Sequence, residues 1–218
     1  MNSVLSPRER SVRTPSVLVL ASASPARKAL LISAGIDPEI IVSGVDESAV
    51  EAGSPEALCS VLARLKAHSV AERLKRAHGA DHGADLVLGC DSVLAFEGEI
   101  LGKPAGAEEA VKRWQTMRGR SGVLHTGHCL VDLSTGRAAE GVGSTVVHFA
   151  EVSDEEIRSY VDSGEPLHVA GAFTIDGRGG PFVERIEGDH GTVVGLSLPL
   201  LRRLLRELDR SIVDLWHR

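Results

Sequence analysis

Short apolar runs alternate with amphipathic stretches through the first half of the chain. Two runs, Val17 to Ala21 and Leu86 to Cys90, are almost wholly apolar, and each predicts a buried strand. The first run is followed by Ser24 and Pro25, a pair that favours the start of a helix, and Gly35 is suited to end that helix. The pattern predicts strands that pass directly into helices, as in α/β folds.

A longer helix is predicted to begin at Ser54, because apolar residues recur after it at helical spacing. In the second half of the chain, paired apolar runs surround turn residues, which is typical of hairpins. The elements expected there are a hairpin from Val93 to Leu101, a helix from Ala107 to Gly119, strands from Val123 to Leu133 and from Ala138 to Ala150, a helix that begins with a capping box over Ser153 to Glu156, strands and turns from Ala170 to Gly195, and a closing helix from Leu198 to Asp214. Together these elements predict an α/β fold with a mixed sheet.

The composition adds limits on the core and on the number of domains. Hydrophobic residues make up 43% of the 218 residues and aromatic residues only 3%, so aliphatic side chains must fill most of the core. This length suits one domain, which we expect over residues 15–218. Residues 1–14 are polar and lack the apolar segment of a secretory signal, so we expect a disordered N-terminal tail.

Charge and cysteine content bear on partners and location. The net charge is −6, from 24 basic and 30 acidic residues, which argues against a nucleic-acid partner. No apolar run approaches the ~18 residues of a membrane span, so no membrane partner is expected. Cys59, Cys90 and Cys129 are far apart and odd in number, which favours core positions in a reducing compartment, the cytoplasm, over a disulfide framework.

The first candidate site lies where the first strand passes into the first helix. Backbone N–H groups and the positive end of the helix dipole favour phosphate at such a place. Ser22 and Ser24 can donate hydroxyl hydrogen bonds, and Arg27 can place two N–H groups on phosphate oxygens. The alternative is a capped helix whose first turn carries solvated charges.

Three carboxylates form the second candidate. Asp46 and Glu47 follow an apolar run, and Asp91 follows the run that ends at Cys90, where side chains enter a cleft in open α/β sheets. Carboxylate and phosphate oxygens together suit Mg²⁺, and Asp91 could accept a proton from an attacking water. The alternatives are a solvated loop for Asp46-Glu47 and a turn residue for Asp91.

Weaker candidates are two lysines and a glycine-rich stretch. Lys66 flanks the apolar stripe of the long helix, and Lys103 lies in Gly-Lys-Pro; either could neutralise phosphate, although exposed lysines are common. The Gly177 to Gly180 stretch is more often a turn than a ligand cradle, and the P-loop spacing is absent. The nine histidines show no metal-binding spacing, and His125 and His128, three residues apart on a predicted strand, are expected on opposite or neighbouring faces.

The ordered set of motifs resembles the Maf family from about Leu18 to Leu204. The segments that carry the resemblance are LVLASASPARKALL, VDE, the Lys66-Ala67 helix, VLGCDSVLAFEGEILGKP, RGRSG and GEPLHVAGAFTIDGRGGPFVERIEGDHGTVVGLSLPLL. The resemblance implies a long twisted mixed sheet with flanking helices and two lobes around a cleft, as in the inosine triphosphatases, and it suggests a homodimer.

The resemblance also implies roles for particular residues. Six positions match the site of the family: Ser22, Arg27, Glu47, Lys66, Asp91 and Lys103. Asp91 would be the proton acceptor, and Glu47 and Asp91 would hold Mg²⁺ or Mn²⁺. Ala26, Ser92 and Asp176 stand at positions linked to base preference, and they match neither the dTTP/UTP branch nor the 7-methyl-GTP branch.

By the same resemblance, the chain is expected to hydrolyse a nucleoside triphosphate to the monophosphate and pyrophosphate, with a non-standard or modified nucleotide as one candidate substrate. The alternative from another class is a non-catalytic, nucleotide-binding regulator of cell division and septum formation. A proton acceptor at Asp91 favours the enzyme, because a pure binding module has no need of one.

Overall fold

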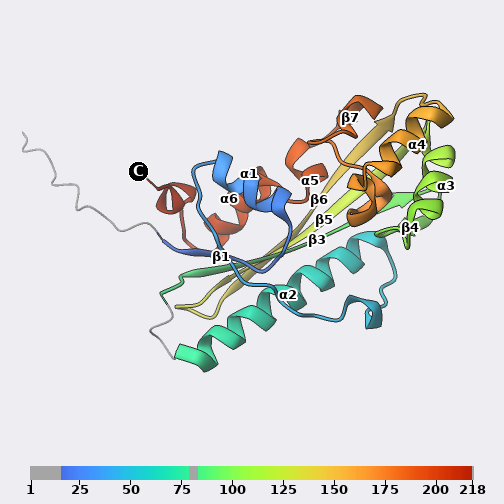
Figure 1. Ribbon diagram of the computed structural model, residues 1–218. Coiled ribbons are helices and arrows are strands. Elements are labelled where there is room, and N and C mark those ends of the chain that lie inside the picture. The colour runs from blue at the N-terminus through green and yellow to red at the C-terminus, as the bar shows by residue number, and fades with distance from the viewer. Residues whose placement is uncertain (1–15, 79–82, 218) are drawn as a thin grey trace, which may run out of the picture.

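The strands form one twisted mixed sheet, which runs the length of the molecule (Figure 1). The computed structural model describes residues 16–78 and 83–217, so the expected tail over residues 1–14 lies outside the described residues. The strand order is β2-β1-β3-β5-β6-β7, with β4 paired to β3; β1 is parallel to β2 and β3, and the other pairs are antiparallel. The strands are β1 (Leu18–Leu20), β2 (Glu39–Ile40), β3 (Leu86–Phe96), β4 (Glu99–Leu101), β5 (Ser121–Asp132), β6 (Ala138–Phe149) and β7 (Val183–Glu187). The mixed α/β sheet expected from the sequence is confirmed.

Helices cover both faces of this sheet. The helix α2 crosses one face, against β3, β5 and β6, while α1, α5 and α6 lie on the opposite face (Figure 1). The helices are α1 (Pro25–Ser33), α2 (Pro55–His78), α3 (Ala107–Met117), α4 (Asp154–Asp162), α5 (His190–Val194) and α6 (Leu198–Glu207), and the 3-10 turns are η1 (Glu47–Ala49), η2 (Glu165–His168), η3 (Ala170–Ala172), η4 (Gly180–Phe182) and η5 (Ile212–Leu215). No helix within the described ranges has the length and apolar content needed to cross a membrane.

Two glycines allow α2 to lie directly on the sheet. A Cβ atom at Gly89 of β3 would stand 2.2 Å from the carbonyl oxygen of Ala63, and one at Gly127 of β5 would stand 2.2 Å from that of Cys59. Because any side chain at these positions would push the helix away, only glycine permits this separation. The close approach brings the inner face of α2, which carries Lys66, against β3 and β5.

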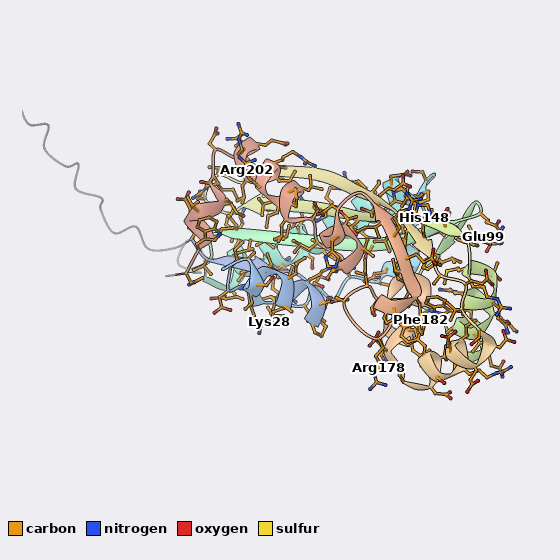
Figure 2. All side chains as sticks on the ribbon, turned by 90° about the horizontal axis from the view of Figure 1, so that it is seen from above. Lys28, Glu99, His148, Arg178, Phe182 and Arg202 are labelled. Carbon is orange, nitrogen blue, oxygen red and sulfur yellow. The ribbon has the colours of Figure 1, made fainter. Side chains whose placement is uncertain are left out.

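Six of the seven aromatic residues gather in the core of a smaller lobe, formed by α3, α4 and the turns η2 to η4, and the seventh, Trp216, lies beside Gly35. The Trp114 ring makes edge-to-face contacts with Phe149, Tyr160 and Phe182 at centroid distances of 5.6, 5.6 and 5.7 Å. Seen from above, Phe182 lies in this lobe, well away from Lys28 on α1 (Figure 2). The two core clusters beneath α1, α2 and α6 hold no aromatic side chain, in line with the expectation of a largely aliphatic core, whereas the cluster in the smaller lobe is rich in aromatic side chains.

Several expected boundaries are wrong. The strand expected to end at Cys90 continues to Phe96, because β5 pairs with it as far as Ala95 and β4 pairs with its last three residues. The closing helix ends at Glu207 rather than Asp214, since Asp209 adopts a left-handed φ of 59°. The stretch expected to hold only strands and turns contains the helix α5, which the Asp189 side chain caps through the Thr192 N–H group.

Candidate active site

A cleft opens where β1 ends beside the longer strand β3. The strand β1 pairs with β3 only as far as Leu88, whereas β3 continues to Phe96. From the end of β1 the chain passes into α1 on one face of the sheet, and from β2 it passes through η1 into α2 on the other face. Side chains from both faces can therefore reach the uncovered edge of β3, which is the usual position of a ligand site in an open α/β sheet.

The cleft encloses a cavity of about 950 Å³ between the two lobes. Nine of the residues proposed from the sequence line it together with Ser24: Ser22, Ala26, Arg27, Glu47, Lys66, Asp91, Ser92, Lys103 and Asp176. Asp46 does not line it; its carboxylate instead accepts from the Ser48 N–H group and caps η1. The expectation that Asp91 ends its strand is wrong, because the residue lies within β3. Asp91 faces the cleft for a different reason. The pairing of β1 with β3 ends at Leu88, three residues before Asp91, so β1 does not cover this part of β3.

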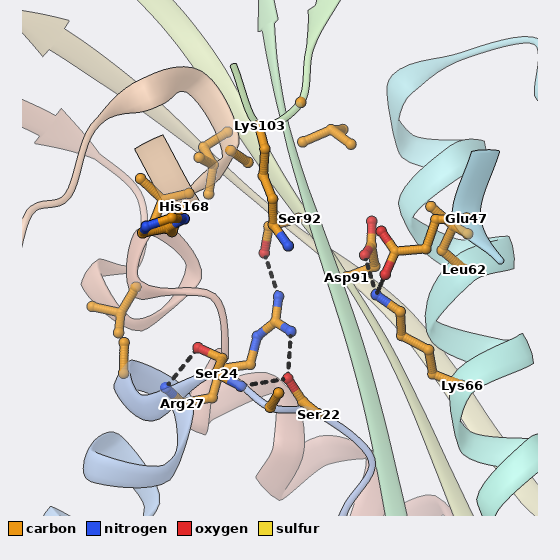
Figure 3. A pocket seen from close by; sticks show the side chains of 18 of the residues that line it. Ser22, Ser24, Arg27, Glu47, Leu62, Lys66, Asp91, Ser92, Lys103 and His168 are labelled. Carbon is orange, nitrogen blue, oxygen red and sulfur yellow. Dashed lines mark hydrogen bonds and ion pairs between the residues drawn. The ribbon is translucent and has the colours of Figure 1, made fainter. Parts of the chain in front are cut away.

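Lys66 joins the two carboxylates on the α2 side of the cleft (Figure 3). Its Nζ atom lies 2.6 Å from Oδ1 of Asp91 and 2.7 Å from Oε1 of Glu47. Asp91 and Lys66 are only 6% and 8% exposed, whereas the Glu47 side chain is about half exposed. Burial raises the pKa of Asp91 above the usual carboxyl range, and the charges of Lys66 and Arg27 oppose this shift. A carboxylate with a raised pKa is a better proton acceptor near neutral pH.

Arg27 approaches the same strand from the opposite face. Its Nε donates to the carbonyl oxygen of Gly195 at 2.7 Å, and Nη1 donates to the carbonyl oxygen of Cys90 at 3.0 Å and to Ser22 Oγ at 3.1 Å. Its Nη2 donates to Ser92 Oγ at 3.0 Å. Four of the five guanidinium N–H groups are thus directed at protein oxygens. In this conformation Arg27 cannot place two free N–H groups on phosphate oxygens, as the sequence suggested.

The two serines differ in the freedom of their hydroxyl hydrogens. Ser22 Oγ accepts from the Ser24 N–H group and from Arg27, so its hydrogen is available to a ligand oxygen in the cavity. Ser92 Oγ also accepts from Arg27, but it lies 2.9 Å from Thr126 Oγ1, which itself donates to the Thr192 carbonyl oxygen. The Ser92 hydroxyl must therefore donate to Thr126, and its hydrogen is already committed.

Lys103, His168 and Asp176 also line the cavity. Figure 3 shows Lys103 beside Ser92, and His168 on the far side of Arg27 from Lys66. The turn that carries Lys103 is fixed, because the Gly102 carbonyl oxygen accepts from the Gly171 N–H group and from Arg113. His168 was not predicted as a site residue. The only sequence signal for it was its place at the end of a short turn after Pro166, and such a position carries no chemical information by itself.

The remaining sequence candidates have structural roles. The N–H groups of Arg178 and Gly179 donate to the Glu165 carboxylate, so the glycine-rich stretch is a turn held by that side chain rather than a ligand cradle. His128 accepts from the Ser197 N–H group, and burial lowers its pKa to about 4. Its ring therefore remains neutral and anchors the start of α6.

Taken together, the fold and the cleft define a two-lobed α/β protein whose charged cavity lies between the lobes. The family model for Maf-like protein matches residues 17–208. The chain is 65% identical to a nucleoside triphosphate pyrophosphatase of Salinispora tropica over 94% of its own length and 89% of the relative's, and 59% identical to one of Streptomyces coelicolor over 91% and 94%. A relative of the same name from Thermosynechococcus vestitus is 54% identical over 90% and 96%. The chain therefore belongs to the Maf family.

Proposed function

We propose that this chain is a nucleoside triphosphate pyrophosphatase, which hydrolyses a nucleoside triphosphate to the monophosphate and pyrophosphate. The observation that carries the proposal is the buried Asp91–Lys66 pair in a cleft where cationic side chains reach in from both lobes. The names of the relatives support the same activity, and they give no support to a non-catalytic regulator of cell division.

The cationic groups would hold the triphosphate between the lobes. Lys66 and Arg27 lie on opposite sides of β3, and Lys103, from the segment between β4 and α3, lines the same cavity. These positive charges would neutralise the charge that develops on the departing pyrophosphate, and the Ser22 hydroxyl would donate to a phosphate oxygen. Arg27 would contribute mainly its positive charge and the hydrogen bond that orients the Ser22 hydroxyl, because most of its N–H groups already donate to protein oxygens.

Asp91 would accept the proton of the attacking water. The water oxygen forms a bond to the α-phosphorus, the α–β anhydride bond breaks, and pyrophosphate leaves with the bonding electron pair. Lys66 holds one oxygen of Asp91 in place at 2.6 Å, so the carboxylate has a fixed orientation toward the cleft. The raised pKa of Asp91, caused first by its burial, favours proton acceptance.

The carboxylates also fit a divalent cation. Oε1 of Glu47 and Oδ1 of Asp91 both point at one positive centre, the Lys66 ammonium group. Carboxylate oxygens that converge in this way, next to phosphate oxygens, are the donors that Mg²⁺ and Mn²⁺ prefer. We propose that Glu47 and Asp91 would hold such an ion, which would supply further neutralisation of the phosphate charge when bound.

Hydrolysis should stop in excess EDTA and resume when Mg²⁺ or Mn²⁺ is restored, because the carboxylate site needs a hard divalent cation. The products should be the nucleoside monophosphate and pyrophosphate, separated by ion-exchange chromatography after reaction with a panel of standard and modified nucleotides. Full activity in the chelator would contradict the metal site. A diphosphate with free orthophosphate would contradict the pyrophosphatase assignment itself.

Arg27→Lys should lower stability as well as activity. A lysine keeps the charge but cannot reproduce the four donated bonds, so buried oxygens such as the Cys90 carbonyl lose their donor. We expect the free energy of unfolding to fall by about 1–3 kcal/mol, as measured by urea denaturation, together with a lower kcat/KM. Lys28→Ala, one residue along α1 at an exposed position, is the control and should change neither quantity appreciably. Unchanged stability in Arg27→Lys would show that these bonds do not anchor the cleft.

We also place the protein in the cytoplasm. The three cysteines are free and buried, which suits a reducing compartment. Residues 15–218 would act as one functional unit, since the cavity is lined from both lobes and neither lobe alone supplies the full set of charges.

A further inference from the structure

A second group of metal-binding side chains lies away from the cleft. It consists of His68 on α2, Cys129 on β5 and Glu140 on β6, and one ligand atom from each lies within 4.8 Å of the others. None of the three lines the cavity described above. Sequence spacing could not reveal this group, because its members come from three elements and are brought together only by the fold.

The register of the sheet and the position of α2 explain why the three residues meet. Cys129 and Glu140 are directly paired across β5 and β6, so their side chains share one face of the sheet. The same face receives α2, which lies close because Gly127, two residues before Cys129, has no side chain. His68 lies on the flank of α2 nearest β6, one turn after Arg64, which also reaches Glu140.

The present contacts leave the three ligand atoms turned toward one another. The Cys129 thiol donates to Oε1 of Glu140 at 3.8 Å, and the Arg64 guanidinium lies 4.0 Å from the other oxygen, Oε2. Within residues 16–78 and 83–217, the half-buried His68 ring has no hydrogen-bond or ion-pair partner. Cys129 is fully buried, while the Glu140 side chain is 33% exposed, so the group opens to solvent on one side.

The donor set identifies the class of ion. A sulfur, an imidazole nitrogen and a carboxylate oxygen together select a borderline divalent transition metal such as Zn²⁺, whereas Mg²⁺ prefers oxygen donors alone. Three protein ligands leave one position of a tetrahedral site for water on the exposed side. We propose that His68, Cys129 and Glu140 form a second metal site, which binds Zn²⁺ or a similar transition-metal ion and joins α2 to β5 and β6.

Binding would require the thiol to lose its proton. Burial, together with the nearby Glu140 charge, raises the pKa of Cys129 to about 12, so the free thiol is protonated at neutral pH. The metal–sulfur bond forms as the S–H bond breaks, and one proton passes to solvent for each ion bound. Arg64 would remain beside the second oxygen of Glu140 and orient the ligating carboxylate.

The site would fix the helix that carries Lys66, because His68 lies only two residues further along α2. An ion that binds only the folded chain raises the free energy of unfolding. The site differs in chemistry from the proposed cation site in the cleft, which offers only carboxylate oxygens from Glu47 and Asp91. A sulfur-specific signal can therefore separate the two sites without any measurement of nucleotide hydrolysis.

Titration of the metal-free full-length protein with Co²⁺ tests the proposal. We expect a near-ultraviolet thiolate-to-cobalt charge-transfer band that saturates at one ion per chain and is displaced by Zn²⁺ but not by excess Mg²⁺. Cys129→Ser should abolish this band. His68→Ala and Glu140→Gln should each weaken Co²⁺ binding by at least about tenfold, on the scale of lost metal contacts.

Cys59→Ser is the matched control, because Cys59 is another fully buried thiol, carried by α2. It should keep the band. His68→Ala and Glu140→Gln alter partly exposed side chains and should still fold. Their Co²⁺ affinities therefore test the proposal even if Cys129→Ser fails to fold. Absence of the band in the wild-type protein, its loss in Cys59→Ser, or unchanged affinity in both His68→Ala and Glu140→Gln would overturn the proposal.

Discussion

Asp91→Asn should lower kcat for nucleoside triphosphate hydrolysis by about 10²–10⁴-fold, the usual cost of a lost general base. The amide has nearly the same shape as the carboxylate but can neither accept the proton of water nor carry the negative charge. Its partner Lys66 would keep Glu47 at 2.7 Å, so the lysine would not be left as an unpaired buried charge. The effect should therefore appear in the rate of hydrolysis, measured by the release of pyrophosphate, and not in the stability of the fold.

Two further measurements on Asp91→Asn separate catalysis from binding and folding. Nucleotide should still bind, as measured by calorimetry, because Arg27, Lys66 and Lys103 all remain in the cavity. Thermal unfolding should remain cooperative. Glu47→Gln is the matched variant, since Glu47 contacts the same Lys66 ammonium group but is about half exposed. A wild-type rate in Asp91→Asn, with a large loss in Glu47→Gln, would move the proton acceptor to Glu47.

Local sequence signals were sufficient to predict the start of α1 and the turn after β3. The Ser24-Pro25 pair starts α1 as expected, and the Ser24 hydroxyl accepts from the Arg27 N–H group. The hairpin after β3 turns at Glu97 and Gly98, both with positive φ angles of 50° and 86°. These features depend on residues close together in the chain, so short-range patterns reveal them.

Contacts between distant segments could not be predicted in the same way. The length of β3 depends on its pairing with β5, which follows it by a whole helix, and the position of Asp91 in the cleft depends on the early end of β1. One of the four oxygens to which Arg27 donates is the Gly195 carbonyl oxygen, which lies 168 residues further along the chain. The resemblance to a family predicted which residues share the site, but only the fold shows how their donors and acceptors are already used.

Gly89→Ala should both destabilise the protein and slow hydrolysis. The added Cβ atom would stand 2.2 Å from the Ala63 carbonyl oxygen and 2.7 Å from the Ala67 backbone nitrogen, and neither atom belongs to a side chain that can rotate away. The helix α2 must therefore move off the sheet, at a cost of about 1–3 kcal/mol in the free energy of unfolding, as in other overpacked cores. Urea denaturation at several protein concentrations would measure this loss.

The same displacement should reach the active site, because Gly89 lies two residues before Asp91 and Ala63 lies three residues before Lys66. The Asp91–Lys66 contact of 2.6 Å spans the two elements that the new methyl group would push apart. A misplacement of about 1 Å can cost roughly 10²-fold in rate, so kcat should fall further than partial unfolding would explain. Gly53→Ala is the control, since a Cβ atom there would meet nothing within 4 Å. If Gly89→Ala matched Gly53→Ala in both stability and rate, close contact between α2 and β3 would not be what positions Lys66 against Asp91.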